Sequence, residues 1–209
     1  MGKRILTARP ISNGMTKKIN SPEAENKIFI ISGPSGVGKT SVAKGVLKKL
    51  PFLKTTVTYT TRTMRLGKKE DKTIIHVSEE EFRNKINNGD FLEWAVVHNN
   101  FYGTDAGIVE RELKKNSLLM NIDVQGALQI KKKLPAKTIL IFLKAENIEE
   151  LTNRIQKREK MPKAILEIRL KNARKELILG KKYDYTVVNK AKKLTDTVNA
   201  VVEIIAKNI

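Results

Sequence analysis

A glycine-rich segment lies between a predicted strand and a predicted helix, and it reads Gly33-Pro34-Ser35-Gly36-Val37-Gly38-Lys39-Thr40. Glycine, four residues and then Gly-Lys-Thr is the pattern of the phosphate-binding loop, or P-loop. The preceding run, Lys27–Ser32, is short and apolar, as in a strand that is buried on both faces. The following run, Thr40–Leu50, has apolar residues at helical spacing and ends before Pro51. A turn that matches by chance is the alternative, but this strand and helix are the context that the motif requires.

The P-loop predicts how a nucleoside triphosphate is held. Glycines let the backbone fold tightly around a phosphate, with N–H groups pointing inward at the positive end of a helix dipole. We expect Lys39 to reach the β- and γ-phosphates of ATP and the Thr40 hydroxyl to hold Mg²⁺. The residues of this segment expected to bind ATP are Gly33, Ser35, Gly36, Val37, Gly38, Lys39, Thr40 and Ser41. The phosphoryl acceptor stays open at this point, because ATPases, GTPases, kinases and motor proteins share the loop.

The rest of the chain alternates between strand and helix patterns, which favours an α/β fold whose parallel sheet is flanked by helices. Further strands are expected at Ser117–Ile122, Thr138–Leu143 and Tyr185–Val188, and further helices at Val124–Lys133, from about Asn147 and from about Leu194 to Ile209. Two stretches break the alternation: residues 58–115 look inserted, and residues 154–180 are highly charged with a helical pattern. We therefore expect the core at 27–57, 116–153 and 181–209, and a basic, disordered tail at 1–26.

Composition narrows the class of protein. The absence of cysteine excludes disulfides and thiolate metal sites and fits a cytoplasmic location. The longest apolar run, Ile139–Leu143, stops at Lys144, far short of the roughly 20 residues that cross a bilayer, so no membrane association is expected. The net charge of +19 suggests a polyanion partner, but the lysines form short scattered groups with few aromatic residues between them. We therefore expect small-molecule substrates rather than nucleic acid, and a monomer or homodimer.

Several downstream segments resemble the motifs of guanylate kinases, in that family's order and spacing. They read Thr58-Tyr59-Thr60-Thr61-Arg62-Thr63-Met64-Arg65-Leu66-Gly67, then Phe91-Leu92-Glu93-Trp94-Ala95, Tyr102-Gly103-Thr104 and Asn121-Ile122-Asp123-Val124-Gln125-Gly126. The first contains the family signature Thr-Thr-Arg-x-x-Arg-x-Gly. The similarity extends from about Ile28 to Ile205, which is nearly everything except the tail. Several motifs in the right order are far more specific than any one of them.

This resemblance implies an ATP-dependent kinase that phosphorylates GMP, or dGMP, to the diphosphate. It makes residues 58–115 the GMP-binding region and residues 154–180 a mobile lid. It also implies that Glu93 reads the base, because one carboxylate can accept both the N1–H and the N2 amino group of guanine, a donor pair that adenine lacks. The alternative for Glu93 is a solvated acid beside a tryptophan.

The other GMP-binding residues follow from the same resemblance. Arg62 and Arg65 would clamp the GMP phosphate with the help of the Tyr102 hydroxyl, and Thr58 and Thr104 would face O6 and N7 of guanine. Asp123 follows a predicted core strand, where α/β folds bind ligands, and would contact Mg²⁺ through water or the guanine amino group. A solvated or capping aspartate is the alternative for Asp123.

The lid supplies the remaining candidates. Arg154, Arg158 and Arg169 match the family's arginine positions in spacing, and with Lys39 they would bring positive charge to the γ-phosphate when the lid closes. Solvated helical arginines are the alternative. Asn189 lies where the family contacts adenine. No strong general base is required, since the second pKa of a phosphate monoester is near 6 and the attacking oxygen is already anionic.

Four positions depart from the family pattern. Ile74 replaces a tyrosine that binds the GMP phosphate, Lys68 and Asp71 replace an acid and a glycine, and Asn121 replaces an aspartate. Loss of the tyrosine contact, about 1.5–3 kcal/mol, weakens GMP binding by roughly 10-fold or more. Two other functions therefore stay open: a catalytically weak guanylate-kinase-like binding module, and a basic, nucleic-acid-associated P-loop ATPase.

Overall fold

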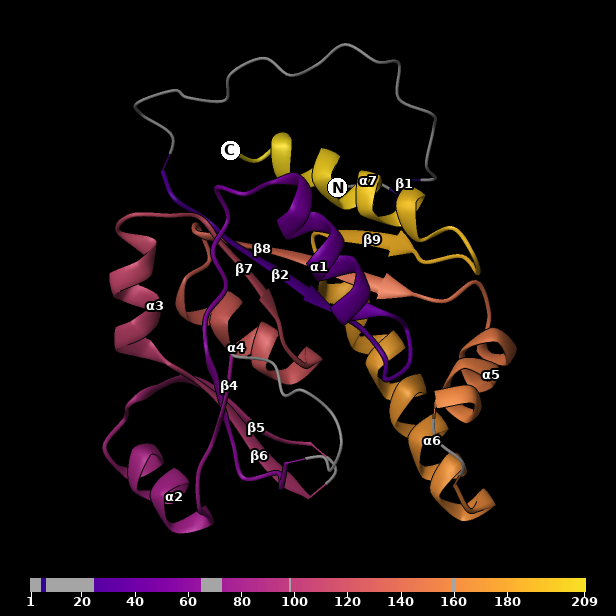
Figure 1. The fold of residues 1–209 in the computed structure, drawn as a ribbon, viewed down its shortest axis with the longest axis horizontal. Coiled ribbons are helices and arrows are strands. Elements are labelled where there is room, and N and C mark those ends of the chain that lie inside the picture. Colours follow the sequence, from indigo (N-terminus) through magenta and orange to yellow (C-terminus); the bar gives the residue numbers. More distant parts are fainter. Residues whose placement is uncertain (1–4, 7–24, 65–72, 98, 159–160) are drawn as a thin grey trace.

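The computed structural model describes residues 5–6, 25–64, 73–97, 99–158 and 161–209, which form two sheets and the helices around them (Figure 1). The strands are β1 (Ile5–Leu6), β2 (Ile28–Ser32), β3 (Thr58–Thr60), β4 (Ile74–His76), β5 (Phe91–Val97), β6 (Asn100–Asp105), β7 (Leu118–Asn121), β8 (Thr138–Lys144) and β9 (Tyr185–Val188). The α-helices are α1 (Lys39–Lys49), α2 (Glu79–Asn87), α3 (Ala106–Leu113), α4 (Val124–Lys133), α5 (Ile148–Arg158), α6 (Lys163–Leu179) and α7 (Leu194–Ala206), and a 3₁₀ turn covers Gly180–Lys182.

The main sheet is parallel throughout, in the order β1-β9-β8-β2-β7. Strand β2 lies between β7 and β8, and its Phe29 is opposite Leu119 of β7 and Ile139 of β8. All five residues of β2 are buried, as a strand covered on both faces must be. The expected α/β class with a parallel sheet flanked by helices is confirmed, and α4 and β9 have the predicted bounds.

Helices cover both faces of this sheet because successive β2 side chains point in opposite directions. Phe29 and Ile31 belong to one apolar cluster with buried residues of α1, α5 and α7. Ile28 and Ile30 belong to a second cluster with buried residues of α3 and α4. Figure 1 shows α1 and α7 lying to one side of the strands and α4 to the other. Nucleotide-binding loops of such a sheet lie at the carboxyl ends of its strands.

The first 26 residues were expected to form a disordered tail, and the described residues among them include a short strand. Ile5–Leu6 form β1, which pairs in parallel with Thr186 and Val187 of β9. The physical reason is that β9 would otherwise be an edge strand, with backbone N–H and C=O groups open to a further strand. Residues 1–4 and 7–24 lie outside the described part of the chain.

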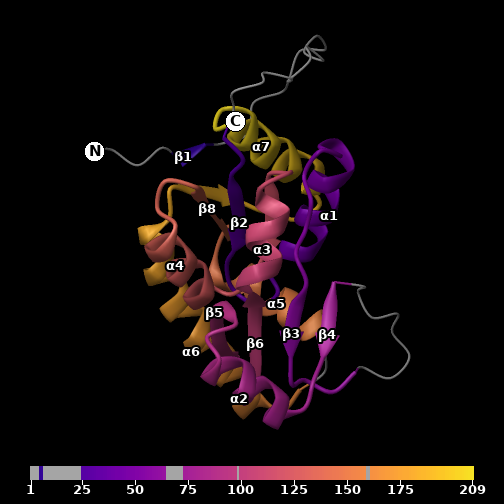
Figure 2. The same cartoon turned by 90° about the vertical axis from the view of Figure 1, so that its left-hand side faces the viewer.

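The segment that looked inserted forms its own sheet, in the order β4-β3-β6-β5. Strands β3 and β4 are parallel, whereas β6 is antiparallel to both β3 and β5. Helix α2 covers it, starting from a capping box in which Ser78 and Glu81 bond each other's backbone N–H. In Figures 1 and 2 this smaller sheet lies at the end of the molecule away from α7.

Helices α5 and α6 form the charged segment that was expected to be a lid. Helix α5 runs across the expected lid boundary at residue 154, since Leu151 and Ile155 are both buried in the main core. Helix α6 ends against the sheet, where a Cβ added to Gly180 would lie 2.7 Å from the Phe142 ring. No helix in the described residues is both long enough and apolar enough to span a membrane.

Candidate functional site

The P-loop leads from β2 into α1 through backbone conformations that favour glycine. Gly38 has φ +98°, in the left-handed region, and a Cβ there would lie 2.6 Å from Asn189 Nδ2. A Cβ on Gly33 would overlap the Leu143 carbonyl oxygen, which is backbone and cannot move aside. In the described residues no side chain caps the N terminus of α1, and its first turn holds no acid. The positive end of α1 is therefore open to an anion.

Backbone carbonyls of the loop position the Lys39 side chain, and a residue of β7 contacts the Thr40 side chain. Lys39 Nζ donates to the carbonyl oxygens of Gly33, at 2.6 Å, and Pro34, at 3.2 Å, so the ammonium lies inside the loop. Thr40 Oγ1 accepts from Asn121 Nδ2 at 3.3 Å. Asn121, which the sequence identified only as a departure from the family pattern, is thus the neighbour of the expected Mg²⁺-binding hydroxyl.

Two cavities meet at Lys39. The larger, about 510 Å³, is walled by the P-loop, by Arg154 of α5 and by Glu176 of α6. The smaller, about 170 Å³, extends toward the second sheet. Its lining contains most of the residues predicted to recognise GMP, namely Thr58, Glu93, Tyr102 and Asp123, together with Lys39. Because Lys39 and Asp123 line both cavities, one continuous cleft joins the phosphate-binding loop to Glu93.

Glu93 is the most buried carboxylate of this cleft, with 2% of its surface exposed. Its Oε1 accepts from the Thr104 hydroxyl at 2.7 Å, whereas its Oε2 is buried and has no hydrogen-bond partner among the described residues. Thr104, which was expected to face O6 and N7 of guanine, thus also orients the carboxylate through its hydroxyl. Burial, helped by the nearby charge of Asp123, raises the pKa of Glu93 to about 7, although the Thr104 hydrogen bond and the charge of Lys133 lower it. A buried acceptor of this kind calls for a ligand that donates hydrogen bonds.

Asp123 begins α4 as its N-cap. Its Oδ1 accepts from the backbone N–H groups of Gln125, at 2.7 Å, and Gly126, at 3.2 Å. The alternative of a capping aspartate therefore holds for one oxygen, while the residue still lines both cavities.

A pH dependence of stability follows from Glu93. Its folded-state pKa is raised to about 7, so the stability it contributes is complete below its ordinary pKa of 4.5 and is lost as the pH rises through 7. We expect the unfolding free energy of wild type, minus that of Glu93→Gln, to become smaller from pH 5 to pH 8, because only wild type has the carboxyl group that ionises. Glu176, whose pKa burial also raises to about 7, is present in both proteins and cancels in the difference. Denaturant titrations at several pH values measure this, and a difference that is independent of pH contradicts it.

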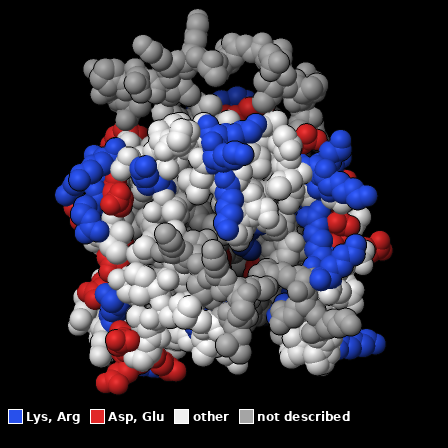
Figure 3. All heavy atoms as spheres, in the orientation of Figure 1, with Lys and Arg blue, Asp and Glu red and all other residues white. Residues whose placement is uncertain are grey.

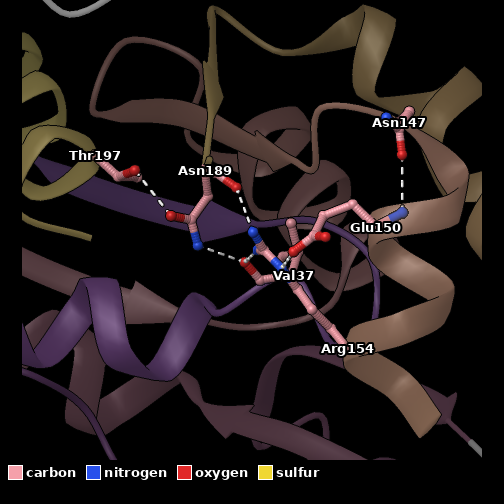
Figure 4. A network of polar contacts seen from close by, with 6 residues as sticks. All are labelled: Val37, Asn147, Glu150, Arg154, Asn189 and Thr197. Carbon is pink, nitrogen blue, oxygen red and sulfur yellow. Dashed lines mark hydrogen bonds and ion pairs between the residues drawn. The ribbon is translucent and has the colours of Figure 1, made fainter. Parts of the chain in front are cut away.

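Figure 4 shows that the side chains of Arg154 and Asn189 both contact the P-loop at the Val37 carbonyl. The Val37 carbonyl oxygen accepts from Asn189 Nδ2 at 2.7 Å and from Arg154 Nη1 at 3.4 Å. Arg154 also donates to Glu150 Oε1 at 2.7 Å and to the Asn189 carbonyl at 2.9 Å. Asn189 Oδ1 in turn accepts from the Thr197 hydroxyl at 2.8 Å. The Asn189 side chain, expected beside adenine, is 6% exposed and packs behind the loop.

This network predicts a stability effect. We expect Asn189→Ala to lower the unfolding free energy by about 1–3 kcal/mol, since it leaves the Val37 carbonyl and the Thr197 hydroxyl without their amide partner. For a chain of this length that is a fall in Tm of about 2–4 °C per kcal/mol. Thermal unfolding measures it, with the exposed Asn153→Ala as the control. Equal Tm values for the two variants would argue against a structural role of Asn189.

Several predicted site residues are placed elsewhere or lie outside the described residues. Arg62 is half-buried after β3, where its carbonyl oxygen contacts His76 Nδ1 at 2.6 Å, and Ile74 pairs with Thr58 in the β3–β4 ladder. Arg65, Lys68 and Asp71 lie outside the described residues, as does the side chain of Arg158. Arg169 is half-buried on α6. Ser35 and Ser41 line the larger cavity.

Sequence reasoning missed Glu176. It lies on α6 and lines the larger cavity, and its buried Oε2 has no hydrogen-bond partner in the described part of the chain. Burial raises its pKa, while the charge of Lys39 lowers it. In the sequence it is one acid among many charges of a helical segment, and no spacing distinguishes it from a solvated residue.

The guanylate kinase family matches residues 25–208. The chain is 40% identical over 182 residues to the guanylate kinase of Thermotoga maritima, covering 87% of this chain and 86% of that protein. It is 42% identical over 163 residues to the guanylate kinase of Fusobacterium nucleatum, covering 78% and 87%. A crystal structure of guanylate kinase from Anaplasma phagocytophilum is similar with a TM-score of 0.72 and 31% identity, covering 88% of this chain and 86% of that one.

Proposed function

Because the chain belongs to the guanylate kinase family, we propose that it transfers the γ-phosphoryl group of ATP to GMP or dGMP, giving ADP and the nucleoside diphosphate. One observation carries the proposal: Glu93 and Lys39 line the same small cavity. A carboxylate suited to guanine and a lysine suited to ATP phosphates thus face one cleft. We propose that the reaction takes place in the cytoplasm, which the lack of cysteine in the chain supports.

Base recognition rests on Glu93. With Oε1 held by Thr104, the buried Oε2 needs a donor, and the N1–H and N2 amino group of guanine supply two donors side by side. Adenine presents no such pair, so binding AMP would leave the carboxylate unpaired in a buried site. Hydrogen-bonding sites of this kind reject a wrong substrate by roughly 10⁴-fold. Thr58 and Tyr102, on the same cavity wall, are proposed to contact the nucleotide, and Arg62 and Arg65 to bind its phosphate.

Phosphoryl transfer depends on positioning and charge. An oxygen of the GMP phosphate attacks the γ-phosphorus of ATP, the bond from that phosphorus to the β–γ bridging oxygen breaks, and ADP leaves. The backbone of the P-loop, the start of α1 and Lys39 hold the ATP phosphates. Arg154, Arg158 and Arg169 are proposed to add positive charge where the phosphoryl group moves.

Mg²⁺ is proposed to accompany ATP. The Thr40 hydroxyl, Asn121 and Asp123 all line the larger cavity and offer the oxygen ligands or water contacts that Mg²⁺ prefers. When bound, the ion supplies charge neutralisation between the phosphates. Asn121 offers one neutral oxygen where the family pattern has a carboxylate, so less negative charge faces the ion.

The two alternative functions are not favoured. A binding module would not need Lys39 and Thr40 beside Glu93 in one cleft. A nucleic-acid-associated ATPase would not need a buried carboxylate in the second cavity. The basic side chains of the described residues also lie in separate groups on the face that Figure 3 shows.

A coupled assay of ADP release tests the proposed function. Purified protein is incubated with ATP, Mg²⁺ and one of GMP, dGMP, AMP, CMP or UMP. We expect ADP to form with GMP and dGMP at rates far above the rates with the other nucleotides. ADP formation that nucleic acid stimulates and GMP does not would instead favour the ATPase, and binding of GMP without turnover would favour the binding module.

A further inference from the structure

Helix α4 holds strand β5 on both sides of Glu93. The Gln129 side chain accepts from the Trp94 backbone N–H at 3.4 Å and donates to the Trp94 carbonyl at 2.9 Å. Lys133 Nζ donates to the Leu92 carbonyl at 2.6 Å. Leu92 and Trp94 are the immediate neighbours of Glu93, so side chains of one helix fix the backbone before and after the carboxylate.

Gly126 lies on the same face of α4, because it precedes Gln129 by three residues and Lys133 by seven. A Cβ added there would overlap Glu93 Oε2 and lie 2.9 Å from Glu93 Cδ. It would also lie 3.3 Å from Asp123 Oδ2. The backbone at Gly126 is ordinary right-handed helix, which any residue adopts except proline. The backbone conformation therefore does not require a glycine at this position. The glycine instead leaves space for the Glu93 carboxylate.

We propose that this α4 face, made of Gly126, Gln129 and Lys133, determines base specificity by positioning the Glu93 carboxylate. Gly126 makes room for the carboxylate, while Gln129 and Lys133 hold β5 so that Oε2 points into the cleft. The inference rests on the proposed function, in which Glu93 reads guanine. Since α4 begins at Asp123, which lines both cavities, a single helix then links the base-reading group to the ATP side of the cleft.

Gly126→Ala tests the proposal against a matched control, Gly107→Ala. Both glycines lie in the first turn of a helix that an aspartate caps, Asp123 for α4 and Asp105 for α3. An added Cβ at Gly107 lies 3.4 Å from Asp105 Oδ1, an ordinary contact. Titration calorimetry without ATP should show GMP binding about 10-fold weaker or more in Gly126→Ala, as for loss of one charge-assisted hydrogen bond. ATP binding should not fall, because the added methyl group overlaps Glu93 and not the P-loop.

A second variant tests whether GMP affinity is lost because the carboxylate is displaced or because the fold is disturbed. Glu93→Asp shortens the side chain by one methylene, so in the double variant Gly126→Ala/Glu93→Asp the carboxylate withdraws from the added methyl group. GMP affinity should then fall by less than the product of the two single effects. Gln129→Ala should raise the KM for GMP and reduce discrimination against AMP, with the KM for ATP unchanged.

The possible outcomes distinguish this inference from the proposed function. Unchanged GMP affinity in Gly126→Ala, in a wild type that forms GDP, overturns the positioning role and leaves the kinase assignment intact. A wild type that forms no GDP from ATP and GMP overturns the proposed function directly. Equal losses of GMP and ATP affinity in Gly126→Ala also contradict the inference, because a disturbed fold would affect both.

Discussion

Lys39→Ala is expected to lower kcat by about 10³-fold while leaving the protein folded. The ammonium lies inside the P-loop, where it donates to the Gly33 and Pro34 carbonyl oxygens, and it borders both cavities of the cleft. Charge placed in this way stabilises the phosphoryl group during transfer, and loss of one such preorganised group costs about 10²- to 10³-fold or more. Coupled-assay kinetics with saturating ATP and GMP measure the effect.

The control for this variant is Lys44→Ala, which removes an exposed lysine from the same helix. It should retain wild-type kcat, since its charge lies outside the cleft. Calorimetric titration of Lys39→Ala with GMP adds a second readout: the affinity for GMP should change little, because Glu93 and its hydroxyl partner are untouched. A Lys39→Ala enzyme with wild-type turnover would refute the assignment of the loop as the ATP site.

Glu93→Gln is expected to abolish the preference for GMP over AMP. The wild type should prefer GMP by roughly 10⁴-fold in kcat/KM, and the variant should bring the ratio to within about 10-fold. An amide keeps the volume and still accepts from Thr104, but it presents an N–H group toward the donors of guanine. That N–H can donate to N1 of adenine, so AMP turnover should rise while GMP turnover falls.

The measurement is kcat/KM for both nucleotides in wild type, Glu93→Gln and the surface control Glu80→Gln, an exposed acid on α2. The control should discriminate as wild type does. Glu93→Ala should lower GMP turnover without the gain for AMP, since it offers neither donor nor acceptor. Undiminished discrimination in Glu93→Gln would mean that another group reads the base.

The sequence predicted the parts of this protein that depend on local patterns. The P-loop, the buried strand before it and the helix after it follow from spacing and hydrophobicity alone, and α4 and β9 were predicted to the residue. The resemblance to guanylate kinases identified Glu93, Thr58 and Tyr102, which line one cavity.

Other features depend on contacts between distant residues, which no local pattern encodes. The expected partner of the Asn189 amide was adenine, yet its neighbours are Val37 and Thr197, which converge only when β9, α7 and the P-loop pack together. The pairing of Ile5–Leu6 with β9 and the burial of Glu176 depend on such packing as well. Gly126 was part of a recognised motif, but the proximity that suggests its proposed role depends on the position of Glu93 on another sheet.

The most direct test of the account is calorimetric titration with a bisubstrate compound in which guanosine and adenosine are joined by five phosphates. If Glu93 and Lys39 face one cleft, each chain should bind one molecule, more tightly than either GMP or ATP because the second contact is intramolecular. Both Glu93→Gln and Lys39→Ala should weaken that binding. Two molecules bound per chain, or an affinity no higher than that for ATP alone, would show that the two residues belong to separate sites.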